Sequence, residues 1–433
     1  MRPRAFRVAQ SIRVESLAPF ASGLATFLLF VAPQPVCLGT AVSRILNLSP
    51  SPGQQTDSEI SKQSPDSLAR ALATALSQGQ DKRAREILGE ILKQPQLDPD
   101  FLLAVGGQFA QHDRYAEAAL AFSRCVGDHP AVFEAHYNLA LAEFAEGKLA
   151  EALAALEAAP HSSAAQELAL LYLRGKVEYG LGKKTEAERD LTAAFSRAPQ
   201  QESYALDLGL YYLQQHAYDQ AARVLERGAT LNPQSPFLHL GLSLAQFLGG
   251  REAQSLESVE NLLKVQPDFS PAFLLAAFVL DVNGKLEDAE KLAAQGLARH
   301  RPTAYLYYLH AAILVKLESK DYGRILKELA LAGREIPDCG LCSLTASKVH
   351  EAQGNFPAAT ADLEQAVRFA PDYADAWYRL ASLYARVGRK ADAAQARIRF
   401  ERLKADKEDR ETAMFRKVLL QTLSGEGQSA ASQ

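Results

Sequence analysis

The residues with the clearest capacity for chemistry are two cysteines three positions apart, Cys339 and Cys342. They follow a Pro-Asp step where a helix is expected to begin, and a helix N-terminus lowers the pKa of a nearby thiol. A thioredoxin-type redox motif should follow a strand, and a zinc site needs a second ligand pair where only His350 is near. The pattern favours structural thiols or a possible local disulfide, with metal and redox roles as alternatives.

The other polar residues form no catalytic pattern. The nine His are scattered, without the HExxH spacing of a zinc protease. No GxSxG, Walker or GxGxxG motif sits between a strand and a helix. Carboxylates are abundant, but no pair stands out as general acid and base. The sequence therefore predicts no enzyme, with no catalytic residue, no metal site and no cofactor.

Composition describes a folded, mainly helical chain. Its 433 residues are 48% hydrophobic and 23% charged, and they exceed the usual size of a single core. The net charge is −4 and no long block of Lys or Arg occurs, so nucleic acid is not expected as a partner. High Ala and Leu content with few β-branched runs favours helix.

The N-terminus has the features of an export signal. Four Arg precede the apolar run Leu17–Ala32, and small residues follow it. This arrangement predicts a signal peptide over residues 1–41, with an uncleaved signal anchor as the alternative, because the run is short for a membrane span. Residues 42–64 are rich in Ser, Pro and Gln and are expected to form a flexible linker. We therefore expect a periplasmic or extracellular protein, or one anchored to a membrane by this segment.

An internal repeat of about 34 residues is the strongest signal in the chain. Its units start at Pro65, Pro99, Phe133, Leu168, Glu202, Pro236, Ser270, Leu306, Gly340 and Ala374. Position 20 is Ala in eight units, namely Ala84, Ala118, Ala152, Ala187, Ala221, Ala289, Ala359 and Ala393. Position 15 is Gly in seven, namely Gly79, Gly147, Gly182, Gly250, Gly284, Gly354 and Gly388. Position 32 is Pro in six, namely Pro130, Pro199, Pro233, Pro267, Pro337 and Pro371.

Each of these columns has a physical reason. Gly at position 15 can take the left-handed conformation that ends a first helix, and Ala at position 20 lets a second helix approach it closely. Pro at position 32 ends the second helix. A single helix pair cannot bury its own apolar face, so neighbouring pairs must stack. Ser255 and Ile325 depart from the Ala column, and the unit ending at Pro302 and Thr303 is longer.

The pattern resembles the tetratricopeptide repeat family, in particular an exported bacterial member. The best-fitting units carry Leu208, Gly209, Tyr212, Ala221 and Pro233, and Trp377, Leu380, Tyr384, Gly388 and Ala393. The resemblance implies an all-α fold, an α-solenoid that winds as a right-handed superhelix of about nine to ten helix-turn-helix repeats. It covers residues 65–405. Residues 406–423 are expected to form a C-terminal capping helix, apolar towards the last repeat, and residues 424–433 a disordered tail.

In the family, the first helices line a concave groove, with positions 2, 5, 9 and 12 facing inward. In the central units these positions hold Tyr137, Leu141, Phe144, Tyr172, Lys176, Tyr179, Leu206, Leu210, Leu213, Leu240, Leu244, Phe247, Phe278, Tyr307 and His310. The set is apolar and aromatic, which suits an apolar peptide or helix of a partner protein. The alternative is that each of these side chains packs against adjacent repeats.

The sequence thus predicts a non-catalytic scaffold that binds a partner peptide or helix in its concave groove. Resemblance to exported members suggests a role in envelope assembly or secretion. Two alternatives are a thiol redox or metal-binding factor that uses Cys339 and Cys342, and an accessory partner of polysaccharide-assembly machinery. The partner is expected to be a protein or peptide, and a membrane is involved only if the N-terminal anchor stays attached.

Overall fold

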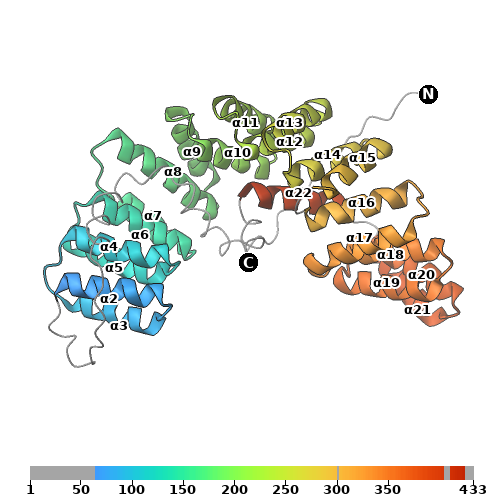
Figure 1. The fold of residues 1–433 in the computed structure, drawn as a ribbon, viewed down its shortest axis with the longest axis horizontal. Coiled ribbons are helices and arrows are strands. Elements are labelled where there is room, and N and C mark those ends of the chain that lie inside the picture. Colours follow the sequence, from blue (N-terminus) through green and yellow to red (C-terminus); the bar gives the residue numbers. More distant parts are fainter. Residues whose placement is uncertain (1–63, 300–301, 404–409, 425–433) are drawn as a thin grey trace. The chain divides into compact units, whose positions relative to one another are not determined.

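The computed structural model describes residues 64–299, 302–403 and 410–424, and the described residues form helices and connecting turns without a strand. The expected signal segment at 1–41 and nearly all of the linker at 42–64 lie outside the described residues, as does the tail beyond Ser424. The contacts divide the chain into two units, Met1–Ala198 and Pro199–Gln433, called here the N-terminal and the C-terminal unit. Figure 1 shows the helices of both.

The described part of the N-terminal unit consists of paired helices. They are α2 (Pro65–Ser77), α3 (Asp81–Lys93), α4 (Pro99–Gln111), α5 (Tyr115–Asp128), α6 (Phe133–Ala145), α7 (Leu149–Glu157), α8 (Ala164–Gly180) and α9 (Lys184–Arg197). The first unit is a regular pair, since Leu68 and Leu72 of α2 are buried.

The C-terminal unit continues the pairing and adds one further helix. Its pairs are α10 (Glu202–Gln214) and α11 (Tyr218–Leu231), α12 (Pro236–Leu248) and α13 (Glu252–Val265), α14 (Ser270–Val282) and α15 (Leu286–Leu297), α16 (Ala304–Lys316) and α17 (Tyr322–Glu335), α18 (Gly340–Ala352) and α19 (Phe356–Phe369), and α20 (Ala374–Arg386) and α21 (Lys390–Leu403). The last helix is α22 (Arg410–Ser424). The predicted all-α solenoid of helix-turn-helix repeats is confirmed.

Local sequence explains where the helices begin. Three first helices start with a polar capping residue followed by Pro, whose fixed φ suits the first helical position. The caps of α2, α4 and α12 are Ser64, Asp98 and Ser235, and each side chain accepts a hydrogen bond from a backbone N–H of the first turn. Capping residues therefore mark the start of three repeat units, in addition to the Gly, Ala and Pro columns.

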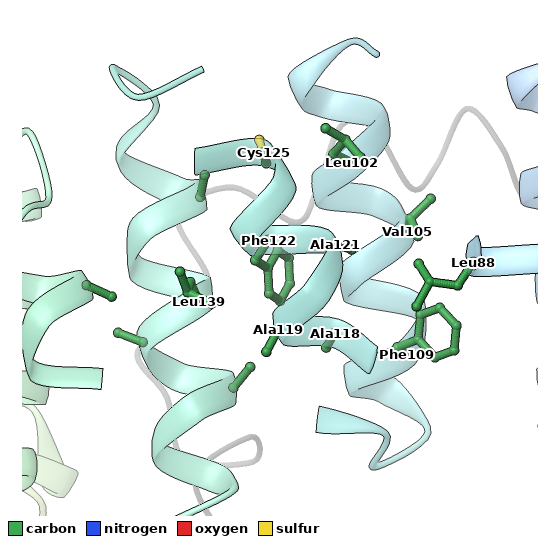
Figure 2. Close-up of a cluster of buried hydrophobic side chains, with 14 of the residues drawn as sticks. Leu88, Leu102, Val105, Phe109, Ala118, Ala119, Ala121, Phe122, Cys125 and Leu139 are labelled. Atoms are coloured by element: carbon green, nitrogen blue, oxygen red, sulfur yellow. The ribbon is translucent and has the colours of Figure 1, made fainter. Parts of the chain in front are cut away.

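Small residues on a first helix allow the second helix of the same pair to approach closely. A Cβ added to Gly106 of α4 would lie 2.3 Å from the ring of Phe122 on α5. A Cβ added to Gly209 of α10 would lie 2.6 Å from Leu225 of α11. Phe122 is buried, and in Figure 2 its helix lies between those that carry Leu102 and Leu139. The missing side chains at position 8 thus make room for the bulky residues at position 24.

The turn inside each pair has one conserved backbone shape. All seven turn glycines have positive φ, from 65° at Gly79 to 82° at Gly388. The other turns place Asp113, His216 and Glu318 at the same position, with φ of 57°, 57° and 53°. Gly takes this conformation without the steric cost that other residues bear. The prediction that position 15 ends the first helix is therefore confirmed by geometry.

The register of one unit differs from the prediction. Its first helix begins at Ala304 rather than Leu306, and the turn between α16 and α17 spans residues 317–321, where the turn after α10 spans only 215–217. The two extra residues thus lie in this turn, and the unit that ends at Thr303 is not the longer one. Ile325 keeps its place on α17, but the longer turn moves the start of α16 two residues towards the N-terminus.

Ser255 stands where most units have Ala at position 20, and a buried hydrogen bond satisfies its hydroxyl. Ser255 of α13 is fully buried, and its Oγ lies 2.9 Å from Oγ of Ser243 on α12. Ser243 Oγ also donates to the carbonyl of Ser255 at 2.9 Å. Since both hydroxyls have partners, the pair carries no unsatisfied polar group.

The close approach at position 8 predicts the effect of adding one methyl group there. Gly106→Ala should lower the free energy of unfolding by about 1–3 kcal/mol, because the Phe122 ring is buried and must move. Gly89→Ala should instead raise stability by up to about 1 kcal/mol, because Gly89 lies inside α3 with nothing within 4 Å of an added Cβ. Urea unfolding followed by circular dichroism measures both.

Phe122→Leu in the Gly106→Ala background serves as the control, since the shorter side chain should recover part of the loss. If Gly106→Ala did not lower the free energy of unfolding, or if Phe122→Leu recovered none of the loss, the packing role of position 8 would be wrong.

Candidate partner-binding face

The C-terminal helix occupies the face made by the first helices of its own unit. α22 packs on α10, α12 and α14, and Figure 1 shows it lying across them. The sequence predicted a cap on the last repeat, formed by α20 and α21, so that placement is corrected. We call the surface of α10, α12, α14 and α16 that faces α22 the first-helix face.

One side of α22 is apolar and buried. Phe415, Leu419 and Leu423 are 0%, 1% and 8% exposed, and their spacing of four residues places them in one row along the helix. Lys417 lies on the exposed side. Burying three such side chains contributes roughly 5–9 kcal/mol before the cost of ordering the helix. The amphipathic pattern of α22 is therefore used in binding the first-helix face.

Aromatic rings receive Phe415 on the first-helix face. The Phe415 ring centroid lies 4.6 Å from that of Phe278 on α14 and 6.1 Å from that of Tyr308 on α16. Phe278 also meets Phe247 of α12 edge to face at 5.6 Å. Such tilted and edge contacts are favourable beyond the burial of area. The cluster makes Phe415 the anchor of α22.

The far end of the buried row lies beside Gly241 of α12. A Cβ added to Gly241 would lie 3.4 Å from Cδ2 of Leu423, an ordinary van der Waals contact, and 3.2 Å from Leu225, a tighter one. Leu423 therefore packs directly against α12. The face accommodates an aromatic residue at one point and a leucine eight residues later.

A charged side chain of α22 meets the turn between α10 and α11. His216 Nδ1 and the Tyr218 hydroxyl are hydrogen-bonded at 2.7 Å in this turn. Burial lowers the pKa of His216, and the positive charge of Arg416 lowers it further. Burial raises the pKa of Tyr218, which the charge and hydrogen bond of Arg416 oppose. Arg416 therefore disfavours a second positive charge at His216.

None of the fifteen predicted groove residues is fully exposed. Seven are buried, namely Phe144, Tyr172, Leu213, Leu240, Leu244, Phe278 and His310. Eight are half-buried, namely Tyr137, Leu141, Lys176, Tyr179, Leu206, Leu210, Phe247 and Tyr307. Phe278 and Phe247 belong to the aromatic cluster that receives α22.

His310 does not belong to the first-helix face. It is fully buried, its Nδ1 lies 2.6 Å from Glu328 of α17, and its Nε2 lies 3.5 Å from Glu290 of α15. Both partners belong to second helices, so the groove assignment of His310 is corrected to an interhelical contact. The corrected register moves positions 2 and 5 from Tyr307 and His310 to Tyr305 and Tyr308. Tyr308, which sequence reasoning missed, is the residue beside Phe415.

The first helices of the N-terminal unit carry their own aromatic residues. The ring of Tyr137 on α6 stacks on Phe133 at 5.6 Å. On α8, Lys176 Nζ lies 5.3 Å from the ring centroid of Tyr172, within the range of a cation–π contact. These side chains interact along their own helices.

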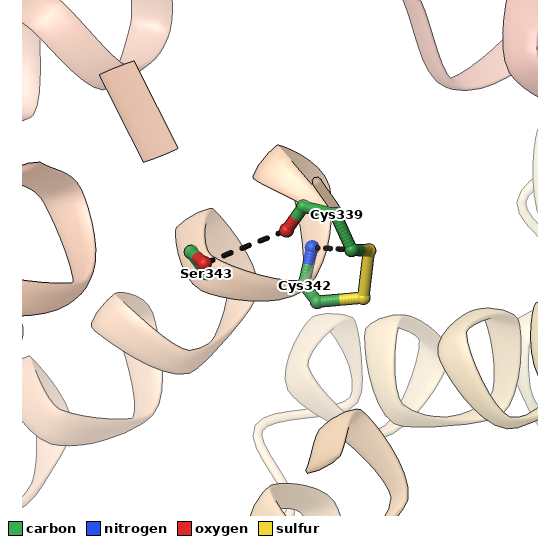
Figure 3. The surroundings of a disulfide bond; sticks show 3 residues. All are labelled: Cys339, Cys342 and Ser343. Atoms are coloured by element: carbon green, nitrogen blue, oxygen red, sulfur yellow. Dashed lines mark hydrogen bonds between the residues drawn. A yellow bond between two sulfur atoms is a disulfide. The ribbon is translucent and has the colours of Figure 1, made fainter. Parts of the chain in front are cut away.

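The structure joins Cys339 and Cys342 in a disulfide at the start of α18 (Figure 3). Cys339 is the capping residue, and its Sγ accepts a hydrogen bond from the Cys342 N–H at 3.2 Å. The two residues are 8% and 6% exposed. Cys125 is a free, buried thiol whose pKa burial raises to about 11, as expected for a small core residue. In this state, none of these three sulfurs offers an accessible thiolate.

Among the described residues, no group of three or more His, Cys, Asp or Glu is placed to hold a metal ion. Across the same ranges, no helix has the length and hydropathy needed to span a bilayer.

Family models match four stretches of the chain. The model described as Tetratricopeptide repeat matches residues 108–167, 172–236 and 206–271. The model described as TPR repeat matches residues 349–388. A search of curated proteins returned no match.

Solved structures of repeat proteins are similar at low identity. A structure of the APC/C hetero-tetramer Cut9-Hcn1 has 12% identity and a TM-score of 0.42, covering 85% of this chain and 99% of that one. A tetratricopeptide repeat protein from Parabacteroides merdae has 18% identity and a TM-score of 0.44, with coverage of 58% and 98%. YrrB, described as having an unusual peptide-binding site, has 16% identity and a TM-score of 0.36, with coverage of 45% and 96%. At these scores the similarity carries no argument about function.

Lowering the pH should weaken the docking of α22. Burial, and then the positive charge of Arg416, hold the pKa of His216 below its ordinary value of 6.5, and release of α22 removes the charge of Arg416. Just below pH 6.5 the released state therefore binds more protons, so docking is strongest above this pH and weakens as the pH falls through that window. Methyl NMR signals of Leu423 should shift towards the released state between about pH 7.5 and about pH 5.5.

His216→Asn is the matched control, because Asn tolerates a left-handed backbone but does not titrate. An unchanged pH response in His216→Asn would show that another group controls release.

Exchanging His310 should affect stability but not docking. His310→Leu leaves Glu328 buried beside Arg324 alone, so the free energy of unfolding should fall by about 1–3 kcal/mol while α22 stays docked. Tyr308→Ala should release α22 because Tyr308 contacts Phe415. Thermal unfolding and the Leu423 methyl signals separate the two effects. Release of α22 by His310→Leu, together with a docked α22 in Tyr308→Ala, would contradict the corrected register of α16.

Proposed function

The chain is a tetratricopeptide repeat protein, and from that premise we propose that it is a non-catalytic scaffold that binds a helical segment of a partner protein on the first-helix face of its C-terminal unit. Binding forms and breaks no covalent bond. The repeats present side chains at fixed spacing, and the partner segment supplies the complementary apolar row.

The observation that carries this proposal is the burial of Phe415, Leu419 and Leu423 on that face. A surface that buries one amphipathic helix provides the apolar area and the aromatic contacts that another would need. The Phe415 site between Phe278 and Tyr308 has the enclosed, aromatic character of binding hot spots.

The proposed setting is an exported one, in envelope assembly or secretion. The N-terminal basic and apolar sequence supports export. The disulfide between Cys339 and Cys342 is compatible with an oxidising compartment, where such bonds persist.

Site-directed photo-crosslinking in the native cell tests the scaffold function. A photoreactive amino acid replaces Leu210, which is half-buried on α10, in the full chain. We expect a discrete crosslinked partner from this position. Leu231 is the control position, because it is 46% exposed at the end of the second helix α11. Crosslinks of equal yield at both positions, or none at Leu210, would contradict the proposal.

A further inference from the structure

The first-helix face of the C-terminal unit is already filled by a segment of the same chain. The buried side of α22 consists of Phe415, Leu419 and Leu423, and its Arg416 reaches the turn at His216 and Tyr218. A partner helix can therefore bind this face only by taking the place of α22. The contacts of α22 accordingly describe what the face selects.

From these contacts we infer that the partner supplies an amphipathic helix that displaces α22, which acts as a competitor built into the chain. The partner helix carries an aromatic residue, a basic residue directly after it, and leucines four and eight positions beyond the aromatic residue. The inference rests on the proposed function and specifies its partner and regulation. The aromatic residue enters between Phe278 and Tyr308. The second leucine packs beside Gly241 of α12.

The basic residue is selected by the turn between α10 and α11. The Tyr218 hydroxyl and His216 ring lie within reach of the Arg416 side chain. The Tyr218 hydroxyl accepts a hydrogen bond from Arg416, and a carboxylate in the place of Arg416 has no proton to donate to it. A basic residue in this place therefore distinguishes the expected helix from other amphipathic helices.

α22 is suited to being displaced because its helical state depends on docking. It has 15 residues, and isolated helices of this length are marginal in water. Release and unfolding of α22 are thus one step, which leaves the stacked pairs α10–α21 in place. Segments with few contacts of their own are those that open locally.

The short connection between α21 and α22 determines how tightly a partner helix must bind in order to displace α22. Residues 404–409 join Leu403 of α21 to Arg410, and seven Cα steps reach at most about 25 Å. A short tether gives α22 an effective concentration in the millimolar range at its own binding site. A free helix of equal intrinsic affinity is therefore largely excluded, and a partner with tighter binding is admitted.

Fluorescence anisotropy with a synthetic peptide of residues 410–424 tests this competition on the full-length protein. Phe415→Glu releases the internal helix, so the peptide should bind this variant about 100-fold more tightly than it binds wild type, as expected for a millimolar effective concentration and a peptide Kd of roughly ten micromolar. Lys417→Glu is the matched control, because Lys417 is on the exposed side of the same helix and its exchange should leave the peptide excluded.

Peptide variants test the expected chemistry without altering the protein. Glu in place of Leu419 in the peptide should abolish binding to the Phe415→Glu protein, and Glu in place of Arg416 should weaken it several-fold. Circular dichroism of the proteins should show unchanged repeat helicity. Equal binding to wild type and Phe415→Glu would overturn the competitor role. No binding to Phe415→Glu with helicity retained would overturn the helix site.

A further outcome would assign the face to a second copy of the chain. If light scattering showed wild type as a dimer that Phe415→Glu converts to monomer, α22 would be exchanged between copies, and the inference of a foreign helix would be overturned. Failure of the inference is also distinguishable from failure of the scaffold function. A partner that crosslinks at Leu210 equally in wild type and Phe415→Glu would leave the function standing and remove the competitor.

Discussion

The whole repeat array depends on how closely the two helices of a pair can approach. Most first helices carry a small residue at position 8, and where it is Gly, as at Gly106 and Gly209, the second helix fills the space with Phe122 or Leu225. Because one such pair buries too little apolar surface to be stable alone, each pair also packs on the next. Position 8 of a first helix therefore faces its own partner helix, and the large residues at positions 5, 9 and 12 are left for the other side.

That opposite side becomes the binding face of the C-terminal unit. Large residues such as Phe247, Phe278 and Tyr308 are brought side by side by the stacking of successive pairs. The chain covers this surface with α22, whose Phe415 is completely buried there. Covering an aromatic face with a tethered helix limits its exposure to solvent and to unselective binding. The same arrangement makes access to the face a matter of competition between helices.

The repeat architecture could be predicted from sequence because local chemistry repeats. Gly250 and Gly284 mark turns whose positive φ suits glycine, and the Ala column marks the close approach of helices. The register of α16 could not be corrected from its own sequence, because residues 304–316 are apolar on most sides and the insertion after Lys316 breaks no pattern. His310 was misplaced for this reason.

The place of α22 was not predictable either. Its amphipathic pattern showed that one side is covered, but the pattern contains no information about which surface covers it. Packing on the last repeat and packing back on α10, α12 and α14 satisfy the same apolar row. Only the three-dimensional match between Phe415 and the ring cluster of Phe278 and Tyr308 distinguishes them.

Amide hydrogen exchange of α22 in the full-length protein tests the central claim most directly. A 15-residue helix is marginal in isolation, so protection of its amides requires docking. The account predicts that amides between Phe415 and Leu423 exchange at least about 100-fold more slowly than in an unfolded chain, and that Phe415→Glu removes this protection while α10, α12 and α14 stay protected. Exchange at the unfolded rate in wild type would contradict it.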